Sequence, residues 1–309
     1  MRVAVLGGGR SSEHDISLAS AETVRGGLAE AGHDVLDVRI RRDGLWSLAP
    51  EKLRGADVVF PAMHGPFGED GTVQGLLQTL GIPYVGAGVL ASALCLDKAA
   101  FKRFMAGSVP QVPYAVARDG EWPVAAPELP VFVKPAQQGS SVGIAKATTP
   151  EELEAAVREA WKHDPIAVIE GASDGLEVEC GVIGHAEVEV SVPGEIAIKA
   201  DWYDHDAKYE PGGMELVVPA QIEPQVAERV RELAATVFRE AGCSGLARVD
   251  FFVEGDEVLV NELNTMPGFT PTSVFPKLWE ASGVPYPELL DRLVGFALER
   301  AEAEKKYRY

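Results

Sequence analysis

Apolar runs and helical patterns alternate along the first third of the chain. Residues 17–31 and 72–80 have helical character, and Gly32 suits the end of the first helix. Short apolar runs typical of buried strands occupy Val3–Leu6, Val35–Val38, Val58–Met63 and Pro83–Gly86. Strands that alternate with helices are typical of a parallel sheet with crossover helices. The pattern therefore predicts an N-terminal α/β domain over residues 1–86.

The middle of the chain has a different pattern. A helical stretch over residues 91–104 is followed by short extended pieces that are separated by prolines. A further helix is expected to begin at Pro150, because Thr149 can cap it and proline suits the first helical position. The strands expected here are Val131–Lys134, Ile144–Lys146 and Ala167–Glu170. We place a second domain, of α+β character, at residues 87–170.

The last part again combines strands with helices. A polar segment, Asp201–Gly213, precedes a helix at Gln225–Ala241, and a terminal helix is expected at about Tyr286–Ala301. Antiparallel-looking strands are expected at Leu176–Val182, Glu187–Ser191 and Glu195–Lys199, and a hairpin at Arg248–Val253 and Glu257–Leu263. These elements define a third domain, residues 171–309, which is also of α+β character.

The predicted late hairpin carries an unusual set of polar residues. Arg248 and Asp250 share one strand face, as do Glu262 and Asn264, because side chains alternate between faces. With the turn centred on Gly255, positions that sum to about 510 lie opposite, so all four side chains converge. Carboxylate and amide oxygens suit Mg²⁺ held with nucleotide phosphates. An edge hairpin with a solvated polar face is the alternative, but both strands are otherwise very apolar.

A glycine–serine loop, Gly139–Gly143, lies between two predicted strands, and Lys134 ends the first of them. Backbone N–H groups of such a loop can cradle phosphates, and a lysine can add a point charge. A plain hairpin turn is the alternative. The loop also matches the G-x-S-x-G nucleophile elbow of hydrolases with Ser141 at its centre, but that motif requires a helix directly after the turn. Here a strand is expected to follow, which disfavours a serine hydrolase.

Three further segments carry candidate chemistry. Gly7–Arg10 is an incomplete dinucleotide fingerprint, with Glu13 close to where pyrophosphate would lie, so a substrate loop fits better. His64–Gly71 follows an apolar strand and suits a ligand crevice at the carboxyl end of a sheet. Lys208 and Tyr209 lie in the polar segment, where long loops often form lids. Ordinary surface loops are the alternative for the last two segments.

Composition narrows the class of protein. The net charge of −19 argues against nucleic-acid binding, although lysines and bound cations can still make one cleft positive. Three widely spaced cysteines form neither a disulfide framework nor a zinc pattern, which fits a reducing cytoplasm. No apolar run approaches the ~18 residues of a membrane span.

Six motifs, in this order and with this spacing, resemble those of the D-alanine–D-alanine ligases, a branch of the ATP-grasp enzymes. The resemblance spans nearly the whole chain. The motifs are GGRSSEHDIS (Gly8–Ser17), HGPFGEDGTVQG (His64–Gly75), ASALCLDK (Ala91–Lys98), KPAQQGSSVG (Lys134–Gly143), DHDAKY (Asp204–Tyr209), and Arg248–Asp250 with NELNTMPGFT (Asn261–Thr270).

The resemblance implies an ATP-grasp fold in which an N-terminal parallel α/β domain joins two α+β domains that sandwich ATP. The residues that match ATP-binding positions are the phosphate-binding Lys98 and Lys134, the closing loop Ser140, Ser141 and Val142, the adenine-reading hinge Glu170, Gly171 and Ala172, the ribose-binding Glu177, the base-sandwiching Trp202 and Phe252, and Asn261. Those that match the ligands of two Mg²⁺ ions, with Mn²⁺ as an alternative metal, are Asp250, Glu262 and Asn264.

For the substrate side, the resemblance implies D-alanyl-D-alanine synthesis through a D-alanyl phosphate, as a step in making peptidoglycan precursors. Residues that match the catalytic positions are Glu13, linked through Ser140 to Tyr209, and Arg248 with the Gly268 N–H. Those that match substrate positions are His64, Lys208, Ser273 and Val274. The family also suggests a homodimer.

Other functions remain open at this point. Another ATP-grasp carboxylate–amine ligase would need Lys98, Lys134 and the metal ligands, but not Glu13, His64 and Tyr209. A D-alanine–D-lactate ligase is disfavoured, because such relatives usually lack the tyrosine that matches Tyr209. A non-catalytic nucleotide-binding module is disfavoured by the intact lysines and metal ligands.

Overall fold

The computed structural model describes residues 1–123, 125–139, 142–198 and 214–307. Its first sheet is parallel, with strand order β2-β1-β3, as the alternating pattern predicts. The strands are β1 (Arg2–Gly8), β2 (Asp34–Ile40) and β3 (Val58–Pro61). The connecting helices are α1 (His14–Glu30), the 3₁₀ helix η1 (Pro50–Gly55) and α2 (Thr72–Thr79). The loop after β3 therefore begins at the carboxyl edge of the sheet.

The second sheet is antiparallel, with order β4-β7-β5-β6. Its strands are β4 (Tyr114–Arg118), β5 (Val131–Pro135), β6 (Ala145–Ala147) and β7 (Ile166–Gly171), and its helix is α5 (Pro150–Ala160). The side chain of Thr149 accepts the Glu152 N–H and so caps α5, and Pro150 opens the helix as predicted. Because the element that follows Gly143 is strand β6 and not a helix, the strand–helix arrangement of a nucleophile elbow is excluded.

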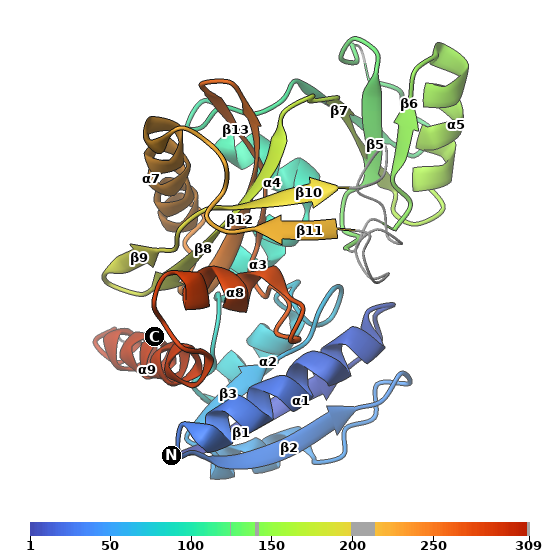
Figure 1. The fold of residues 1–309 in the computed structure, drawn as a ribbon. Coiled ribbons are helices and arrows are strands. Elements are labelled where there is room, and N and C mark those ends of the chain that lie inside the picture. The colour runs from blue at the N-terminus through green and yellow to red at the C-terminus, as the bar shows by residue number, and fades with distance from the viewer. Residues whose placement is uncertain (124, 140–141, 199–213, 308–309) are drawn as a thin grey trace.

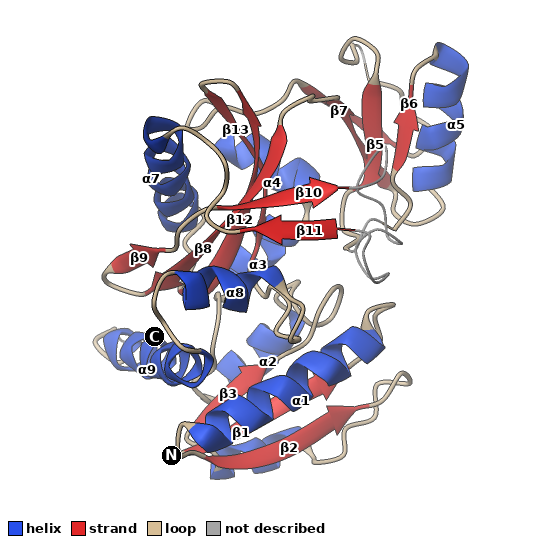
Figure 2. Ribbon diagram, viewed as in Figure 1, coloured by secondary structure: helices blue, strands red, loops and turns tan. Residues whose placement is uncertain are grey.

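The third sheet lies at the centre of the molecule (Figure 2). Its order is β11-β10-β8-β12-β13, with β9 paired to β8. The strands are β8 (Leu176–Gly184), β9 (Val188–Val190), β10 (Gly194–Ile198), β11 (Met214–Val217), β12 (Gly245–Glu254) and β13 (Glu257–Asn264), and the helices near them are α7 (Pro224–Glu240), α8 (Val274–Ala281) and α9 (Tyr286–Glu304). Helix α7 packs on one face of β8, β12 and β13, where their apolar side chains form a core.

The register of the β12–β13 hairpin places the predicted polar residues opposite one another. Arg248 pairs with Asn264 and Asp250 pairs with Glu262. The positions sum to 512 here and to 511 nearer the turn, since a bulge follows Asp250. The four side chains therefore share one face, as alternation predicts, although the register differs slightly from that of a regular hairpin.

Two predicted elements differ from the structure. The single helix expected over 91–104 is two helices, α3 (Val89–Leu96) and α4 (Lys98–Met105). They are separated at Asp97, which is extended and whose side chain accepts the Ala100 N–H as the cap of α4. The strand expected at 83–86 forms only one isolated bridge, between Tyr84 and Val59.

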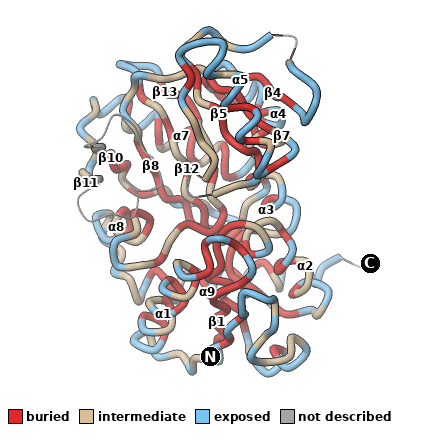
Figure 3. The backbone as a smooth tube through the Cα atoms, turned by 90° about the vertical axis from the view of Figure 1, so that its right-hand side faces the viewer, coloured by how far each residue is buried: buried red, intermediate tan, exposed pale blue. Residues whose placement is uncertain are grey.

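The C-terminal helix α9 packs beside α1 and against β3, so the two ends of the chain share a core (Figure 1). Buried backbone runs along β1 and along β8 and β12 (Figure 3). The Arg300 guanidinium on α9 donates to the carbonyls of Tyr84 and Gly86 and fixes this connection. The domain boundaries near residues 86 and 170 stay predictions. In the described part of the chain, no helix is long and apolar enough to cross a membrane.

Candidate active site

A cleft of about 1000 Å³ collects residues from all three sheets and their loops. Glu13 and His64 lie in the loops that follow β1 and β3 of the parallel sheet, Lys134 is on β5 of the second sheet, and Glu262 is on the central hairpin. The predicted site residues that line this cleft are Glu13, His64, Lys98, Lys134, Glu170, Gly171, Ala172, Glu177, Arg248, Phe252, Asn261, Glu262, Asn264, Gly268, Ser273 and Val274. The fold therefore brings most of the sequence-predicted residues to one place.

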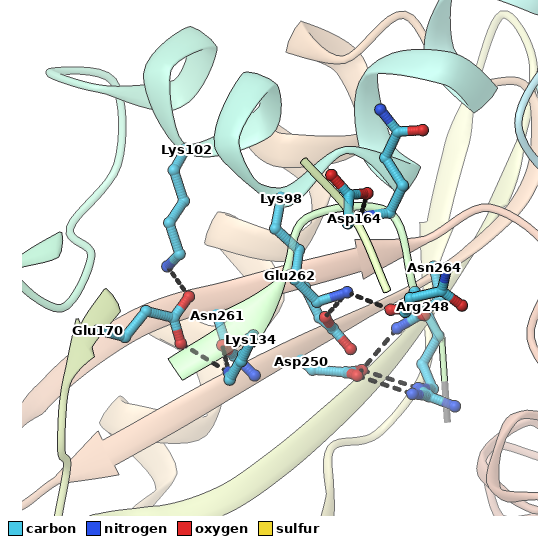
Figure 4. Close-up of polar contacts among 12 residues, drawn as sticks. Lys98, Lys102, Lys134, Asp164, Glu170, Arg248, Asp250, Asn261, Glu262 and Asn264 are labelled. Carbon is cyan, nitrogen blue, oxygen red and sulfur yellow. Dashed lines mark hydrogen bonds and ion pairs between the residues drawn. The ribbon is translucent and has the colours of Figure 1, made fainter. Parts of the chain in front are cut away.

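Arg248 is held by two carboxylates, of which Figure 4 shows that of Asp250. Its Nε and Nη2 each lie 2.7 Å from an oxygen of Asp250. Its Nε also lies 2.9 Å from Oε2 of Glu179, a buried residue on β8. The guanidinium is therefore oriented in advance, as a group that stabilises developing negative charge must be.

The oxygen donors on the hairpin fit a magnesium ion. The Asn264 amide nitrogen donates to Asp250 at 2.9 Å, which leaves the amide oxygen to accept a cation. Among the described residues, no group of three or more His, Cys, Asp or Glu side chains forms a closed metal cage. Two carboxylates and one amide suit Mg²⁺, which usually takes few protein ligands and completes its shell with phosphates and water. Glu262 and Asn264 line the cleft, whereas Asp250, which Arg248 holds, does not.

Two lysines approach this face, one from α4 and one from β5. Lys98 begins α4, and its Nζ lies 3.5 Å from Oε2 of Glu262 and donates to the Gln138 carbonyl at 3.0 Å. Lys134, on β5, places its Nζ 2.6 Å from Oε2 of Glu170 and 3.5 Å from Oδ1 of Asn261. Both ammonium groups are therefore placed where triphosphate oxygens can replace or join their present partners.

The predicted phosphate loop is only partly described. Ser140, Ser141, Trp202, Lys208 and Tyr209 lie outside the described residues. The Val142 N–H donates to the Gly139 carbonyl and closes the turn, but Val142 does not line the cleft. A Cβ at Gly139 would lie only 2.7 Å from Oε2 of Glu13. The start of the loop therefore packs directly against the predicted ammonium anchor.

Strand pairing in the central sheet places the residues that are predicted to bind adenosine. Glu177 lies opposite Phe252 across β8 and β12, and both line the cleft. The Gly171 N–H donates to the Pro113 carbonyl, which holds the end of β7 in place. The side chain of Glu170, by contrast, turns into the protein, where it is 3% exposed. Its side chain therefore binds lysines, and only its backbone is left for a base.

The loop after β13 is closely packed around Gly268. A Cβ at this position would lie 2.5 Å from Oγ of Ser273, so only glycine fits without a shift. Ser273 Oγ accepts the Thr270 N–H at 3.0 Å and is 2.8 Å from the Thr270 hydroxyl. These contacts hold the Gly268 backbone next to Ser273 and Val274 at the start of α8.

His64 ties this loop to the parallel sheet. Its Nδ1 lies 3.0 Å from the Met266 carbonyl, an acceptor, so Nδ1 carries the proton. Its Nε2 then accepts from the Ser20 hydroxyl at 2.8 Å, and the same hydroxyl accepts the Phe269 N–H at 3.3 Å. Burial lowers the pKa of His64, and nearby Glu13 offsets this only in part. A neutral His64 therefore fixes the loop that carries Gly268, besides lining the cleft.

Sequence reasoning missed three charged residues in or beside the cleft. Lys102 lies one helical turn after Lys98, so helical spacing could have indicated it. Glu179 shares a strand face with the predicted Glu177, so alternation could have indicated it. Glu69 stands within the His64 motif and accepts the Gly65 N–H at 2.9 Å.

The Glu69 carboxyl should give the protein a measurable pH dependence. Burial, with Glu13 nearby, raises its pKa to about 8. Between its ordinary pKa of about 4.5 and about 8, the folded state keeps a proton that the unfolded state loses, so stability falls as pH rises. We expect Glu69→Gln to remove this decline, because the amide oxygen can still accept the Gly65 N–H.

Denaturant unfolding at pH 5.5 and pH 8.5 measures the effect. The free energy of unfolding should fall more between these pH values in the wild type than in Glu69→Gln. The exposed Glu30→Gln on α1 is the matched control and should follow the wild type. Equal pH dependence in wild type and Glu69→Gln would contradict the account.

Comparison with known proteins decides the family. A family model described as "D-ala D-ala ligase C-terminus" matches residues 93–295, and "D-ala D-ala ligase N-terminus" matches residues 2–55 and 47–87. The chain belongs to the D-alanine–D-alanine ligase family. Two similar relatives are the D-alanine–D-alanine ligases of Deinococcus radiodurans, 43% identical over 96% of this chain and 98% of the relative, and Caldicellulosiruptor bescii, 40% identical over 100% and 98%.

Solved structures of similar ligases share the fold. The D-alanine–D-alanine ligase from Coxiella burnetii is 34% identical, with a TM-score of 0.86 over 99% of this chain and 96% of that one. The VanG D-Ala:D-Ser ligase from Enterococcus faecalis is 31% identical, with a TM-score of 0.84 over 96% and 99%. The predicted ATP-grasp ligase fold is thereby confirmed.

Proposed function

We propose that the chain is an ATP-dependent ligase that joins two molecules of D-alanine into a dipeptide, a building block for peptidoglycan. The observation that carries the proposal is one cleft that contains two lysines, a preoriented arginine and a set of oxygen donors. This arrangement suits phosphoryl transfer, in which positioning and charge neutralisation do most of the work. Membership of the ligase family supports the same conclusion.

The first step activates a carboxylate, which is a poor electrophile because its leaving group would be oxide. A carboxylate oxygen of the first D-alanine attacks the γ-phosphorus of ATP, and ADP leaves with the electrons of the broken P–O bond. We assign Lys98 and Lys134 to the phosphates and Glu13 to the ammonium of this D-alanine. Gly171, Ala172, Glu177 and Phe252 would hold adenosine.

The second step forms the peptide bond. The amine of the second D-alanine, having lost a proton, attacks the acyl carbon, and inorganic phosphate leaves. Arg248 and the Gly268 N–H would stabilise the negative oxygen of the tetrahedral intermediate. Ser273 and Val274, at the start of α8, would hold the second D-alanine together with Lys208, and Ser140 and Tyr209 would complete the site of the first.

We assign Asp250, Glu262 and Asn264 as the protein ligands of magnesium. When bound, Mg²⁺ would neutralise phosphate charge and polarise the bond to the transferring phosphoryl group. The assignment of these three residues rests on their oxygen atoms, which suit magnesium, and on their position on one face of the β12–β13 hairpin.

One assay tests the function. With ATP and magnesium present, D-alanine should stimulate phosphate release, and D-alanyl-D-alanine should appear in equal amount. D-serine and D-lactate, offered with D-alanine, measure the choice of second substrate, and we expect the dipeptide of D-alanine to predominate near neutral pH. No stimulation by D-alanine, or an equal response to L-alanine, would contradict the proposal.

The resemblance to the family also leads us to propose a cytoplasmic homodimer. ATP and D-alanine as substrates support the cytoplasm as the location. Sedimentation equilibrium of the purified protein tests the assembly: a mass near twice 33.0 kDa is expected, and a monomer at micromolar concentration would contradict it.

A further inference from the structure

A buried charge cluster lies next to the nucleotide end of the cleft (Figure 4). It consists of Lys102, Glu170 and Lys134, which are 1%, 2% and 9% exposed. The Lys102 Nζ lies 3.0 Å from Oε1 of Glu170, and the Lys134 Nζ lies 2.6 Å from Oε2. One carboxylate is thus shared between two ammonium groups, one on each oxygen.

The two lysines differ in their access to the cleft. Lys134 lines the cleft, whereas Lys102 does not. Lys102 lies one turn along α4 from Lys98 and extends inward, with its ammonium 5.7 Å from the centre of the Tyr114 ring. Lys102 can therefore affect a ligand in the cleft only indirectly, through its contact with Glu170 or through the electrostatic effect of its own charge.

Lys102 determines the net charge of the buried cluster. Burial alone would raise the pKa of Glu170, but the two lysines outweigh it and lower that pKa to about 2. The cluster therefore carries one net positive charge at neutral pH. If an uncharged residue replaced Lys102, Glu170 and Lys134 would form a pair with no net charge. The cleft beside this pair also contains the carboxylates of Glu177 and Glu262.

We propose that Lys102 is a positioning residue of the nucleotide site: by sharing Glu170, it keeps Lys134 available for the phosphates of a nucleoside triphosphate and keeps the buried cluster positive. This inference rests on the proposed use of ATP. A lysine that merely fills space would support the shape of the whole site, including the base end. A lysine that acts by its charge would strengthen the binding of the phosphates but would not change the binding of the base.

Comparing ATP with adenosine separates these roles. We expect Lys102→Gln, which can still donate to Glu170 but has no charge, to raise the Kd of ATP about tenfold or more, since opposite charges at low dielectric interact strongly over several ångströms. The Kd of adenosine should change less than about threefold, with ADP in between, because adenosine has no phosphate for the cluster to attract. Calorimetry with the full chain measures all three.

Three further variants sharpen the test. Lys102→Arg keeps the charge and should keep ATP affinity closer to that of the wild type than Lys102→Gln does. Arg103→Met removes one positive charge from the next, exposed position of α4 and should change no affinity, which controls for net charge. Thermal unfolding of each variant checks that the fold is retained, and Lys102→Met repeats the loss of charge with a different side chain.

Three outcomes would overturn the inference. In the first, Lys102→Gln and Lys102→Met leave ATP affinity unchanged. In the second, they weaken ATP and adenosine equally, which indicates a role in shape. In the third, neither variant folds although Lys102→Arg does, which indicates a role in stability. If the wild type itself binds no ATP, the proposed function fails instead, so the two failures are distinguishable.

Discussion

Replacing Glu262 with glutamine should lower kcat by about 10²–10³-fold, which corresponds to about 3–4 kcal/mol of transition-state stabilisation. The carboxylate is proposed to ligate magnesium, and the amide that replaces it has no charge and binds a hard cation weakly. The fold should remain intact, because the Glu262 side chain is partly exposed, at 23%. Turnover should recover in part as the magnesium concentration rises.

A matched control lies on the same strand. Glu257 begins β13 at the other end of the hairpin and is exposed. Glu257→Gln should leave turnover and its magnesium dependence unchanged. The metal assignment would be wrong if Glu262→Gln turned over at a near-normal rate, or if its loss were the same at every magnesium concentration.

Arg248 is expected to have the second large effect. Arg248→Lys keeps a positive charge but loses the fork that holds Asp250, and kcat should fall by about 10²–10³-fold, as when an oxyanion donor is removed. Arg248→Met should in addition destabilise the fold by about 3–5 kcal/mol, because it leaves the buried Glu179 carboxylate without this partner.

A double variant separates catalysis from stability. Adding Glu179→Gln to Arg248→Met removes the buried charge, so much of the lost stability should return. Turnover should not return, because no cation faces the developing oxyanion. Recovery of kcat in the double variant would show that Arg248 acts only by holding the sheet together.

The central hairpin shows how far sequence reasoning reaches. Strand alternation and one turn glycine predict that Arg248, Asp250, Glu262 and Asn264 converge, and the register confirms it. The bulge after Asp250 was not predicted, because a two-residue periodicity carries no information about an extra residue in one strand. The predicted roles of these side chains stay proposals.

Other features depend on contacts that no local pattern contains. Asp97 separates two helices because its side chain caps the second, although the apolar spacing runs through it. The meeting of Lys102 with Glu170 depends on how α4 packs against β7. The shared core of α9 and the first sheet joins segments more than two hundred residues apart. Composition and periodicity do not determine such long-range packing.

The central claim is that a carboxylate in this cleft is activated as an acyl phosphate. Turnover of D-alanine labelled with ¹⁸O in its carboxylate tests this most directly. One carboxylate oxygen must leave with the phosphate, so mass spectrometry of the released phosphate should show one ¹⁸O per molecule in step with dipeptide formation. Dipeptide formation with unlabelled phosphate would contradict the account.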